Sequence, residues 1–438
     1  MKYPKGLETL EKAKQWIAGT SPGQIRRSEF YSDGAWPSFF KKAKGVEVWD
    51  IDDNHFIDMA FAGDGSTLLG YADPEVDQAV MEVLQSGAVC TLDAPEMVEL
   101  AEYFNRIHPW AKQTKFAKTK TEALGIAVRI ARAYTKKDKI IQCGEHGWQD
   151  WYLGANLKNP QALDNYGIKG LPTGGVPGCY GDLAYNFDYG RIEQLREIME
   201  KNPGQIAAVV FEPDPGRKVR PDFLLELEKA IREMEAVFIV NESRTAYRMS
   251  TGGAHLSMGI TPDMAVFSNS IANGYPISAV IGSQEVMDAH KTTFIDDAGW
   301  QERIGAKAAL VCMKKCAIHD VAFHLLKIGK RFQDGITQLA EQFDIKLRVK
   351  GYPALPRIDF RDENAPEVKA FFVQKMLDFG FLASDRFYPT FAHETDHVTS
   401  YLLAVKSTFG MIQEAQKESR LKELLKGKPS AMNYNGLD

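Results

Sequence analysis

The sequence has few cysteines, no long hydrophobic run and no excess of basic side chains over its 438 residues. Its five cysteines are scattered and form no Cys-x-x-Cys pair, which excludes a disulfide framework and a zinc knuckle. The longest apolar stretches, such as residues 206–211, are far shorter than the ~20 residues of a membrane-spanning helix. The N-terminus carries charges in place of an apolar signal core. We therefore expect a cytoplasmic protein with no membrane partner.

The charge balance and composition narrow the class further. With 53 basic and 58 acidic side chains the formal charge is −5, so the chain lacks the basic field that holds a nucleic-acid backbone. Its 36 glycines and 20 prolines show ordinary usage, and there is no collagen, heptad or solenoid period. These features indicate a globular, enzyme-sized chain, and they make nucleic acid a poor default partner.

The middle of the chain alternates short β-branched runs with helical periodicity. A helix is predicted over 121–134, where apolar residues recur every three or four positions. Strands separated by helices predict an α/β fold with a mostly parallel sheet covered on both faces. The predicted strands are residues 113–118, 139–144, 206–212, 236–242 and 264–269.

The pattern changes near both ends of this region. A hairpin is predicted around residues 46–61, and strands near 347 and 357–360 are expected after residue 318. Long helices are expected over 324–336, 366–379 and 394–417. We predict three parts: an N-terminal arm (1–50), a large domain (51–320) and a small α+β domain (321–438).

Several of the predicted strands end in polar residues. Ligands of open α/β sheets bind at the carboxyl ends of strands, so these residues are candidates for a site. They are Lys118, Thr119, Lys120, Thr121, Glu145, His146, Glu212, Asn241, Glu242, Arg244 and Asn269.

The order and spacing of four segments carry a family resemblance. They are Ala-Val-Arg-Ile-Ala-Arg-Ala-Tyr at 127–134, His-Gly at 146–147, Gly-Ile-Thr-Pro-Asp at 259–263 and Asn-Gly-Tyr-Pro at 273–276. From about residue 5 to 420 the chain resembles class III aminotransferases, specifically glutamate-1-semialdehyde-aminomutase-like proteins. The resemblance implies the type I fold of pyridoxal phosphate (PLP) enzymes and a homodimer with active sites at the subunit interface.

The resemblance also implies a PLP site, from which this sequence departs. Asn269 stands at the position of the Schiff-base lysine, and an amide cannot form an imine. Asn241 replaces the aspartate that keeps the pyridine nitrogen protonated. Lys120 replaces the glycine of the phosphate-binding turn, and Glu145 replaces the aromatic ring that stacks on the cofactor. Ala298 stands where a partner subunit's threonine would complete the phosphate site.

These changes lead us to expect no cofactor and no metal, with PLP or pyridoxamine phosphate (PMP) only as a weak, dissociable ligand. Glu145, His146 and Glu242 are then candidates for proton transfer, although the last two match the family pattern and have a structural alternative. Substrate-binding candidates are cations that could hold a phosphate or carboxylate, and polar groups that could bind hydroxyls. They are Lys118, Thr119, Lys120, Thr121, Asn241, Arg244, Asn269, Trp300 and Glu302.

Three functional hypotheses follow. The first is a PLP-independent enzyme acting on a small anionic or sugar-like substrate, such as a sugar phosphate. Segments 69–76 and 300–305 resemble family members associated with bacterial surface-sugar biosynthesis. The second is a non-catalytic partner subunit of an active aminotransferase paralogue. The third is an aminotransferase-like or aminomutase-like enzyme with dissociable PLP or PMP.

One motif points to a different chemistry. His393-Glu-Thr-Asp-His397 matches the zinc-protease pattern His-Glu-x-x-His. A helix starting there continues far enough that its next carboxylate, Glu414, lies ~25 Å along the axis, too far to be a third ligand. We therefore assign the motif to the start of the last helix.

Overall fold

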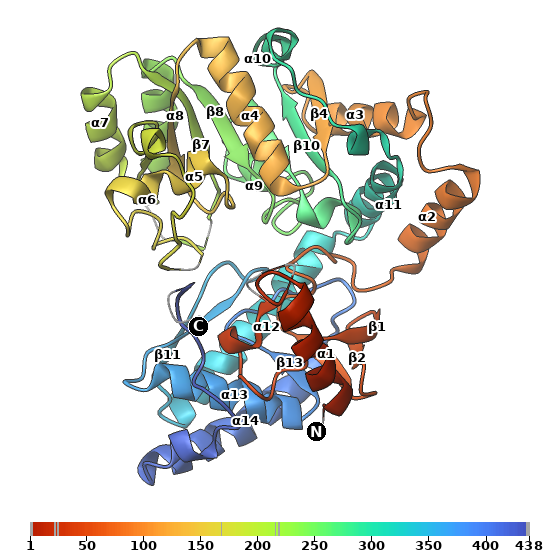
Figure 1. Ribbon diagram of the computed structural model, residues 1–438, viewed down its shortest axis with the longest axis vertical. Coiled ribbons are helices and arrows are strands. Elements are labelled where there is room, and N and C mark those ends of the chain that lie inside the picture. Colours follow the sequence, from red (N-terminus) through yellow and green to blue (C-terminus); the bar gives the residue numbers. More distant parts are fainter. Residues whose placement is uncertain are drawn as a thin grey trace. The chain divides into compact units, whose positions relative to one another are not determined.

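The computed structural model describes residues 3–21, 23, 26–167, 169–214, 216–217 and 220–434. The chain forms two compact units, shown in Figure 1. One unit combines residues 1–73 with 324–438, and the other comprises residues 74–323. Among the described helices, none is long and apolar enough to cross a membrane.

The unit of residues 74–323 is built on a seven-stranded sheet in the order β4-β10-β9-β8-β7-β5-β6. The five strands from β9 to β6 run parallel, and β10 is antiparallel to both of its neighbours. This confirms the mostly parallel sheet. The strands are β4 (Gln113–Ala117), β5 (Lys139–Cys143), β6 (Ala184–Asn186), β7 (Ile206–Phe211), β8 (Val237–Asn241), β9 (Met264–Phe267) and β10 (Ser278–Gly282).

Both faces of this sheet are buried, which explains why its central strands are continuously apolar. Successive residues of a strand point to opposite faces. On β7, Val210 belongs to the core that contains α4, whereas Val209 belongs to the core that contains α8. The same alternation separates Ile239 from Val240 on β8.

Helix α4 (Lys120–Thr135) begins directly after β4 and lies across the sheet (Figure 1). The helix predicted over 121–134 is thus confirmed. Thr119 caps it, with a reciprocal capping box to Glu122. The other α-helices of this unit are α2 (Pro74–Ser86), α3 (Pro95–Ile107), α5 (Asp150–Leu153), α6 (Ala155–Lys158), α7 (Ile192–Lys201), α8 (Phe223–Glu233), α9 (Ala254–Ser257), α10 (Gln284–Met287) and α11 (Ile304–Ile318).

The other unit joins the two ends of the chain in one sheet of order β1-β2-β3-β13. The predicted hairpin is present as β2 and β3, and β13 pairs with β3 in parallel, with Phe381 opposite Ile57. Local sequence pattern cannot show such a long-range pairing, so the grouping of 1–73 with 324–438 differs from the predicted series of arm, large domain and small domain. The strands of this unit are β1 (Phe40–Lys44), β2 (Glu47–Asp50), β3 (His55–Met59), β11 (Leu347–Lys350), β12 (Arg357–Phe360) and β13 (Phe381–Ala383). Strands β11 and β12 form a separate two-stranded sheet.

The last three helices of this unit agree with the expected long helices, whereas the first was not predicted. They are α1 (Pro4–Trp16), α12 (Val321–Gln342, which begins at the end of the other unit), α13 (Ala365–Asp378) and α14 (Thr395–Lys417). The His-Glu-x-x-His motif lies at the start of α14. His393 is buried with Nε2 2.8 Å from the Asp58 carbonyl oxygen, and His397 Nδ1 accepts from the Glu394 N–H as part of a helix cap.

Helix α12 packs so closely on the chain at residue 353 that it requires a glycine. A Cβ atom on Gly329 would lie 1.6 Å from the Pro353 carbonyl oxygen. We expect Gly329→Ala to lower the free energy of unfolding by about 3 kcal/mol, because the backbone must move apart. Gly410→Ala is the matched control in α14, where the nearest atom is 3.5 Å away. It should raise stability by about 0.5–1 kcal/mol. Urea denaturation measures both, and equal effects would contradict the close approach.

Candidate functional site

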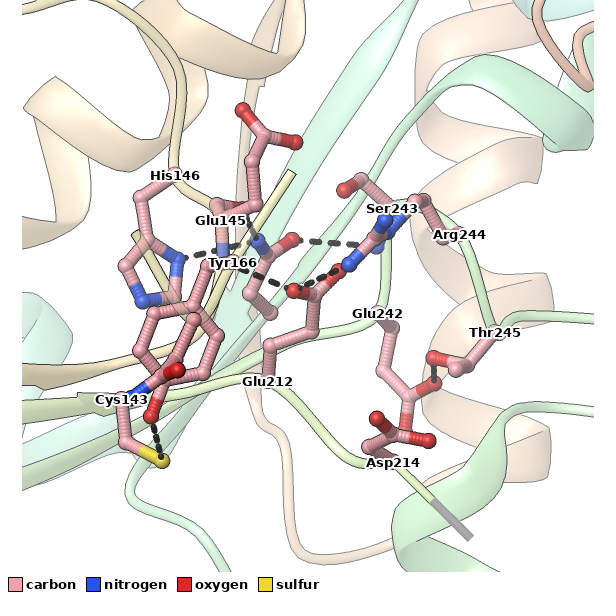
Figure 2. Close-up of polar contacts among 12 residues, drawn as sticks. Cys143, Glu145, His146, Tyr166, Glu212, Asp214, Glu242, Ser243, Arg244 and Thr245 are labelled. Atoms are coloured by element: carbon pink, nitrogen blue, oxygen red, sulfur yellow. Dashed lines mark hydrogen bonds and ion pairs between the residues drawn. The ribbon is translucent and has the colours of Figure 1, made fainter. Parts of the chain in front are cut away.

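The candidate site lies where four adjacent parallel strands end. Glu145 and His146 follow β5, Glu212 follows β7, Asn241 ends β8 and Asn269 follows β9. Because neighbouring parallel strands end at the same edge of a sheet, residues far apart in the sequence come together here. Figure 2 shows the contacts among the first three of these strand ends.

Asn241 is fully buried, and the backbone fixes the orientation of its amide. Its Nδ2 donates to the Glu145 carbonyl oxygen at 3.1 Å, and its Oδ1 accepts from the Ser243 N–H at 3.1 Å. A carbonyl can only accept and an N–H can only donate, so the amide cannot be turned around. Both ends of the Asn241 side chain are therefore engaged within the protein.

The orientation of Asn241 determines the tautomer of His146. The amide Nδ2 lies 3.1 Å from His146 Nδ1, so Nδ1 accepts and the ring proton resides on Nε2. Burial lowers the pKa of His146 to about 4, because an enclosed imidazolium is poorly solvated. Its ring packs against those of Trp151 and Tyr152. At neutral pH His146 is thus an uncharged, enclosed side chain.

Glu145 forms an ion pair with Lys120. The Lys120 Nζ and a Glu145 carboxylate oxygen are 2.8 Å apart, and the side chains are 18% and 24% exposed. Burial raises the pKa of Glu145, but the attraction of Lys120 and then of Arg244 outweighs it and holds the pKa at about 2. The two positions that the resemblance assigns to the phosphate turn and to the stacking aromatic are therefore joined by a direct contact.

Arg244 is paired in the same way with Glu212. Its guanidinium makes two hydrogen bonds of 2.6 Å to the buried carboxylate of Glu212, whose Oε2 also accepts from the Glu145 N–H at 2.8 Å (Figure 2). Bidentate pairs of this kind are strong and geometrically specific. Gly144 permits the close approach, since a Cβ there would lie 2.4 Å from the Glu212 Cβ. Arg244, which was expected to contact a ligand, therefore binds a carboxylate of the protein.

Lys118 contacts Glu302, so two of the substrate-binding candidates bind each other. The Lys118 Nζ lies 2.7 Å from the Glu302 carboxylate and 3.0 Å from the Glu302 carbonyl oxygen. Thr119 serves as a helix cap, and the methyl group of Thr121 approaches the backbone of Gly147. Trp300 packs against the core on the α4 side of the sheet.

Glu242, a candidate for proton transfer, holds a structural position. It is fully buried and accepts hydrogen bonds from the Ala254 N–H (3.0 Å), the His255 N–H (2.7 Å), His255 Nδ1 (2.7 Å) and the Thr245 hydroxyl. These contacts anchor the start of α9. They leave the carboxylate enclosed, which argues against the catalytic role that the sequence suggested.

Asn269 begins a short 3₁₀ turn after β9 with a φ of +53°. It is partly buried, and its Oδ1 accepts from the Ser268 hydroxyl at 3.2 Å. Asparagine tolerates this left-handed backbone conformation better than most residues with a Cβ. The strand end thus holds a short polar side chain without an amine.

The residues do not fit the PLP site that the resemblance describes. Asn269 supplies no amine, and Asn241 supplies no carboxylate and is bound to backbone groups on both sides. Lys120 and Glu145 bind each other in place of a glycine turn and an aromatic ring. Within the described ranges, no group of three or more His, Cys, Asp or Glu residues could hold a metal ion.

Sequence reasoning found most of these positions but missed how they pair. Glu212 was named only as a strand end, although it contacts both Arg244 and the backbone of Glu145. The sequence feature that could have marked Glu212 as part of the site was a Glu-Pro step directly after a buried strand. The pairing of Lys120 with Glu145 had a signal too, because two neutral family positions carry opposite charges here.

Comparison with known proteins confirms the family resemblance. The sequence model of the family described as aminotransferase class-III matches residues 31–408. A 3-aminobutyryl-CoA aminotransferase from Cloacimonas acidaminovorans is 28% identical, over 83% of this chain and 86% of the relative. A glutamate-1-semialdehyde 2,1-aminomutase from Anaeromyxobacter dehalogenans is 27% identical, over 93% and 98% of the two chains.

Solved structures show the same fold. The PLP internal aldimine form of the FumI protein from a Sphingopyxis species superimposes with a TM-score of 0.86 at 23% identity, covering 98% of this chain and 99% of that chain. A lysine-to-alanine variant of glutamate-1-semialdehyde aminomutase from Pseudomonas aeruginosa, in complex with PMP, has a TM-score of 0.78 at 17% identity, covering 93% and 94%. These neighbours confirm the type I fold.

The Lys120–Glu145 pair can be measured with a double-mutant cycle of Lys120→Met, Glu145→Gln and both. At pH 7 we expect a coupling free energy of about 1.5 kcal/mol from urea unfolding. Folding lowers the pKa of Glu145 from 4.5 to about 2, so its stabilisation is complete above about pH 4.5 and is lost as the pH falls toward 2.

The exposed pair of Lys158 and Asp182 is the matched control for this cycle, and no measurable coupling is expected there. Equal coupling in the two pairs, or a Lys120–Glu145 coupling near zero at pH 7, would contradict the assignment of Lys120 and Glu145 as a stabilising ion pair.

The environment of Asn241 can be tested by Asn241→Asp. A carboxylate oxygen would face the Glu145 carbonyl oxygen in the place of an N–H, so we expect unfolding free energy to fall by about 3 kcal/mol at pH 7. Asn269→Asp is the matched control, because aspartate also tolerates a positive φ and can accept from the Ser268 hydroxyl. A stability of Asn241→Asp equal to that of the control would show that the amide is not required.

Proposed function

The chain belongs to the class-III aminotransferases, and on that premise we propose that it is a non-catalytic subunit that supports an active homologous aminotransferase. The observation that carries the proposal is the pairing of charges at the strand ends. Lys120 with Glu145 and Arg244 with Glu212 are internal ion pairs at the centre of the candidate site.

The groups suggested for proton transfer are poorly suited to it. A general acid or base works best when its pKa lies near the operating pH. The pKa of Glu145 is held at about 2 and that of His146 is lowered to about 4, while Glu242 is enclosed by four hydrogen bonds. These properties favour a structural role for all three.

The groups suggested for anion binding are engaged as well. Lys118, Lys120 and Arg244 each contact a carboxylate at 2.6–2.8 Å. An anionic or sugar-phosphate substrate would have to break one of these pairs and leave a partly buried carboxylate without its partner, which is costly. This cost disfavours the PLP-independent enzyme as the leading function.

The retained fold favours a supporting role. Pairing with a homologous subunit requires the family fold, and the class-III model matches residues 31–408 of this chain. The homodimer implied by the resemblance is accordingly replaced in our proposal by a pair with an active homologous subunit in the cytoplasm.

A cofactor titration tests the loss of PLP chemistry. The wild-type chain and Asn269→Lys are titrated with PLP and with PMP while absorbance and thermal unfolding are followed. We expect neither ligand to change the absorbance or raise the unfolding temperature of either protein, because positions 120, 145 and 241 also differ from the family pattern. An active class-III homologue is the positive control.

Two other results of the cofactor titration would contradict the expected loss of PLP chemistry. Binding of PMP by the wild-type chain would support the dissociable-cofactor hypothesis, as in the solved lysine-to-alanine variant that holds PMP. Covalent PLP in Asn269→Lys with transaminase activity would show that only the lysine was missing. Either result would overturn the proposed loss.

Co-purification tests the supporting role. The tagged chain is co-expressed with each class-III aminotransferase encoded in the same genome, and complexes are isolated by size-exclusion chromatography. We expect one homologue to form a stable mixed complex whose turnover or thermal stability differs from that of the homologue alone. A chain that forms only homodimers, and leaves every homologue unchanged, would contradict the proposal.

A further inference from the structure

We propose that an acidic and partly apolar surface on α2, α3 and their connection is a docking site for a subunit with a basic, partly apolar face. We call residues 74–105 the α2–α3 surface, and Figure 1 shows α2 and α3 within the unit of residues 74–323. The inference rests on the supporting role proposed above. It adds where the homologous subunit binds and which charge that subunit presents.

The α2–α3 surface carries charge of one sign. Residues 45–105 contain no lysine or arginine, although the whole chain has 53 basic and 58 acidic side chains. Cations from elsewhere in the same unit pair with two carboxylates of the surface. Lys315 lies 2.6 Å from Glu75, and Arg303 lies 3.3 Å from Glu96. The carboxylates of the α2–α3 surface are Glu75, Asp77, Glu82, Asp93, Glu96, Glu99 and Glu102.

Four of these carboxylates have no counter-charge in the part of the chain that the structure describes. Glu82, Asp93, Glu99 and Glu102 are exposed and form no ion pair there. Glu99 and Glu102 lie three residues apart on α3, so they share one face of that helix. The surface therefore keeps a net negative charge that a basic partner can neutralise.

The same surface exposes large apolar side chains. Single exposed apolar residues are normal, but a group of them marks an interaction site. Leu92 is 79% exposed, and between residues 84 and 93 every residue except Ala88 is exposed. Covering this segment would remove apolar surface from water, which favours association. The large apolar residues are Met81, Leu84, Val89, Leu92 and Val98.

Arg303 fastens the connection between α2 and α3. Its Nε donates to the Gly87 carbonyl oxygen at 2.9 Å, and its backbone N–H donates to the Ala88 carbonyl oxygen at 3.1 Å. Its guanidinium also donates to the Ser86 hydroxyl at 2.7 Å. A segment that is already held in place loses less conformational entropy when a partner binds.

The charge selects the kind of partner. Two copies of this chain that met through the α2–α3 surface would bring the same carboxylates together, and like charges repel. Nucleic acid and anionic lipid are repelled for the same reason. A basic homologous subunit would neutralise the carboxylates and cover the apolar side chains, so the surface favours a mixed pair over a pair of identical chains.

Binding measurements with the homologue that co-purifies with the chain test the docking site. We expect Leu84→Ser and Leu92→Ser each to raise the dissociation constant about tenfold, as for central interface residues. The double variant Glu99→Lys, Glu102→Lys should raise it at least as much. Increasing NaCl from about 0.05 to 0.5 M should weaken the wild-type complex, because salt screens the attraction.

Matched variants in the same unit separate docking from a general change of surface. Leu225→Ser on α8 and Glu200→Lys on α7 also alter exposed side chains, and both should leave the dissociation constant unchanged. Leu92 lies outside any helix, so Leu92→Ser should keep the wild-type unfolding temperature. Its effect then reports on binding even if Leu84→Ser lowers the stability of α2.

The results distinguish failure of the docking site from failure of the supporting role. A homologue that binds every α2–α3 variant as tightly as the wild type overturns the docking site and leaves the supporting role intact. The absence of any binding homologue overturns both. Self-association of the wild-type chain that Leu84→Ser and Leu92→Ser abolish would show that the surface pairs identical chains, and would overturn the basic partner.

Discussion

The ion pair between Lys120 and Glu145 joins the first turn of α4 to the end of β5. Charged side chains at such a partly buried place are costly unless each has an opposite charge or hydrogen-bond partner. The neighbouring strand ends obey the same constraint, because Glu212 is satisfied by Arg244 and by the Glu145 N–H. The charges of the site are thereby directed at one another, whereas His146 Nε2 and Ser243 Oγ are buried without a hydrogen-bond partner among the described residues.

This constraint explains why the changes at the site form a set. A lysine at 120 without a carboxylate at 145 would leave an uncompensated charge, and the reverse is equally true. The amide of Asn241 fits the same network, since it donates to the backbone of Glu145 and to His146 where a carboxylate would be repelled by the carbonyl. The side chains at these positions thus bind one another and the neighbouring backbone.

The fold tolerates these changes because its stability lies elsewhere. The seven-stranded sheet is buried on both faces, by a core around α4 and a separate core around α8. The site residues occupy the strand ends and not the apolar strand interiors. A relative in its PLP-bound form and this chain can therefore share the fold with a TM-score of 0.86 at 23% identity.

Much of the architecture could be predicted from local pattern. Continuous apolar runs such as 206–211 predicted buried parallel strands, and the three-to-four spacing at 121–134 predicted α4 nearly to its ends. Two short strands were missed, the edge strand β6 and the antiparallel β10 between β4 and β9, because a few residues carry little periodic signal. The pairing of β13 with β3 was beyond local pattern, since it joins opposite ends of the chain.

The sequence by itself determined the α/β fold, the family and the identities of the residues at each strand end. It also determined what is missing, because no fold can give Asn269 an amine or Asn241 a negative charge. Only the tertiary structure decided how the remaining charges are used. The sequence alone suggested that Lys118, Lys120 and Arg244 bind a ligand. In the structure each of them contacts a carboxylate from another segment of the chain. Whether a charge faces a ligand or a neighbour depends on which strands lie side by side, and that is a property of the folded sheet.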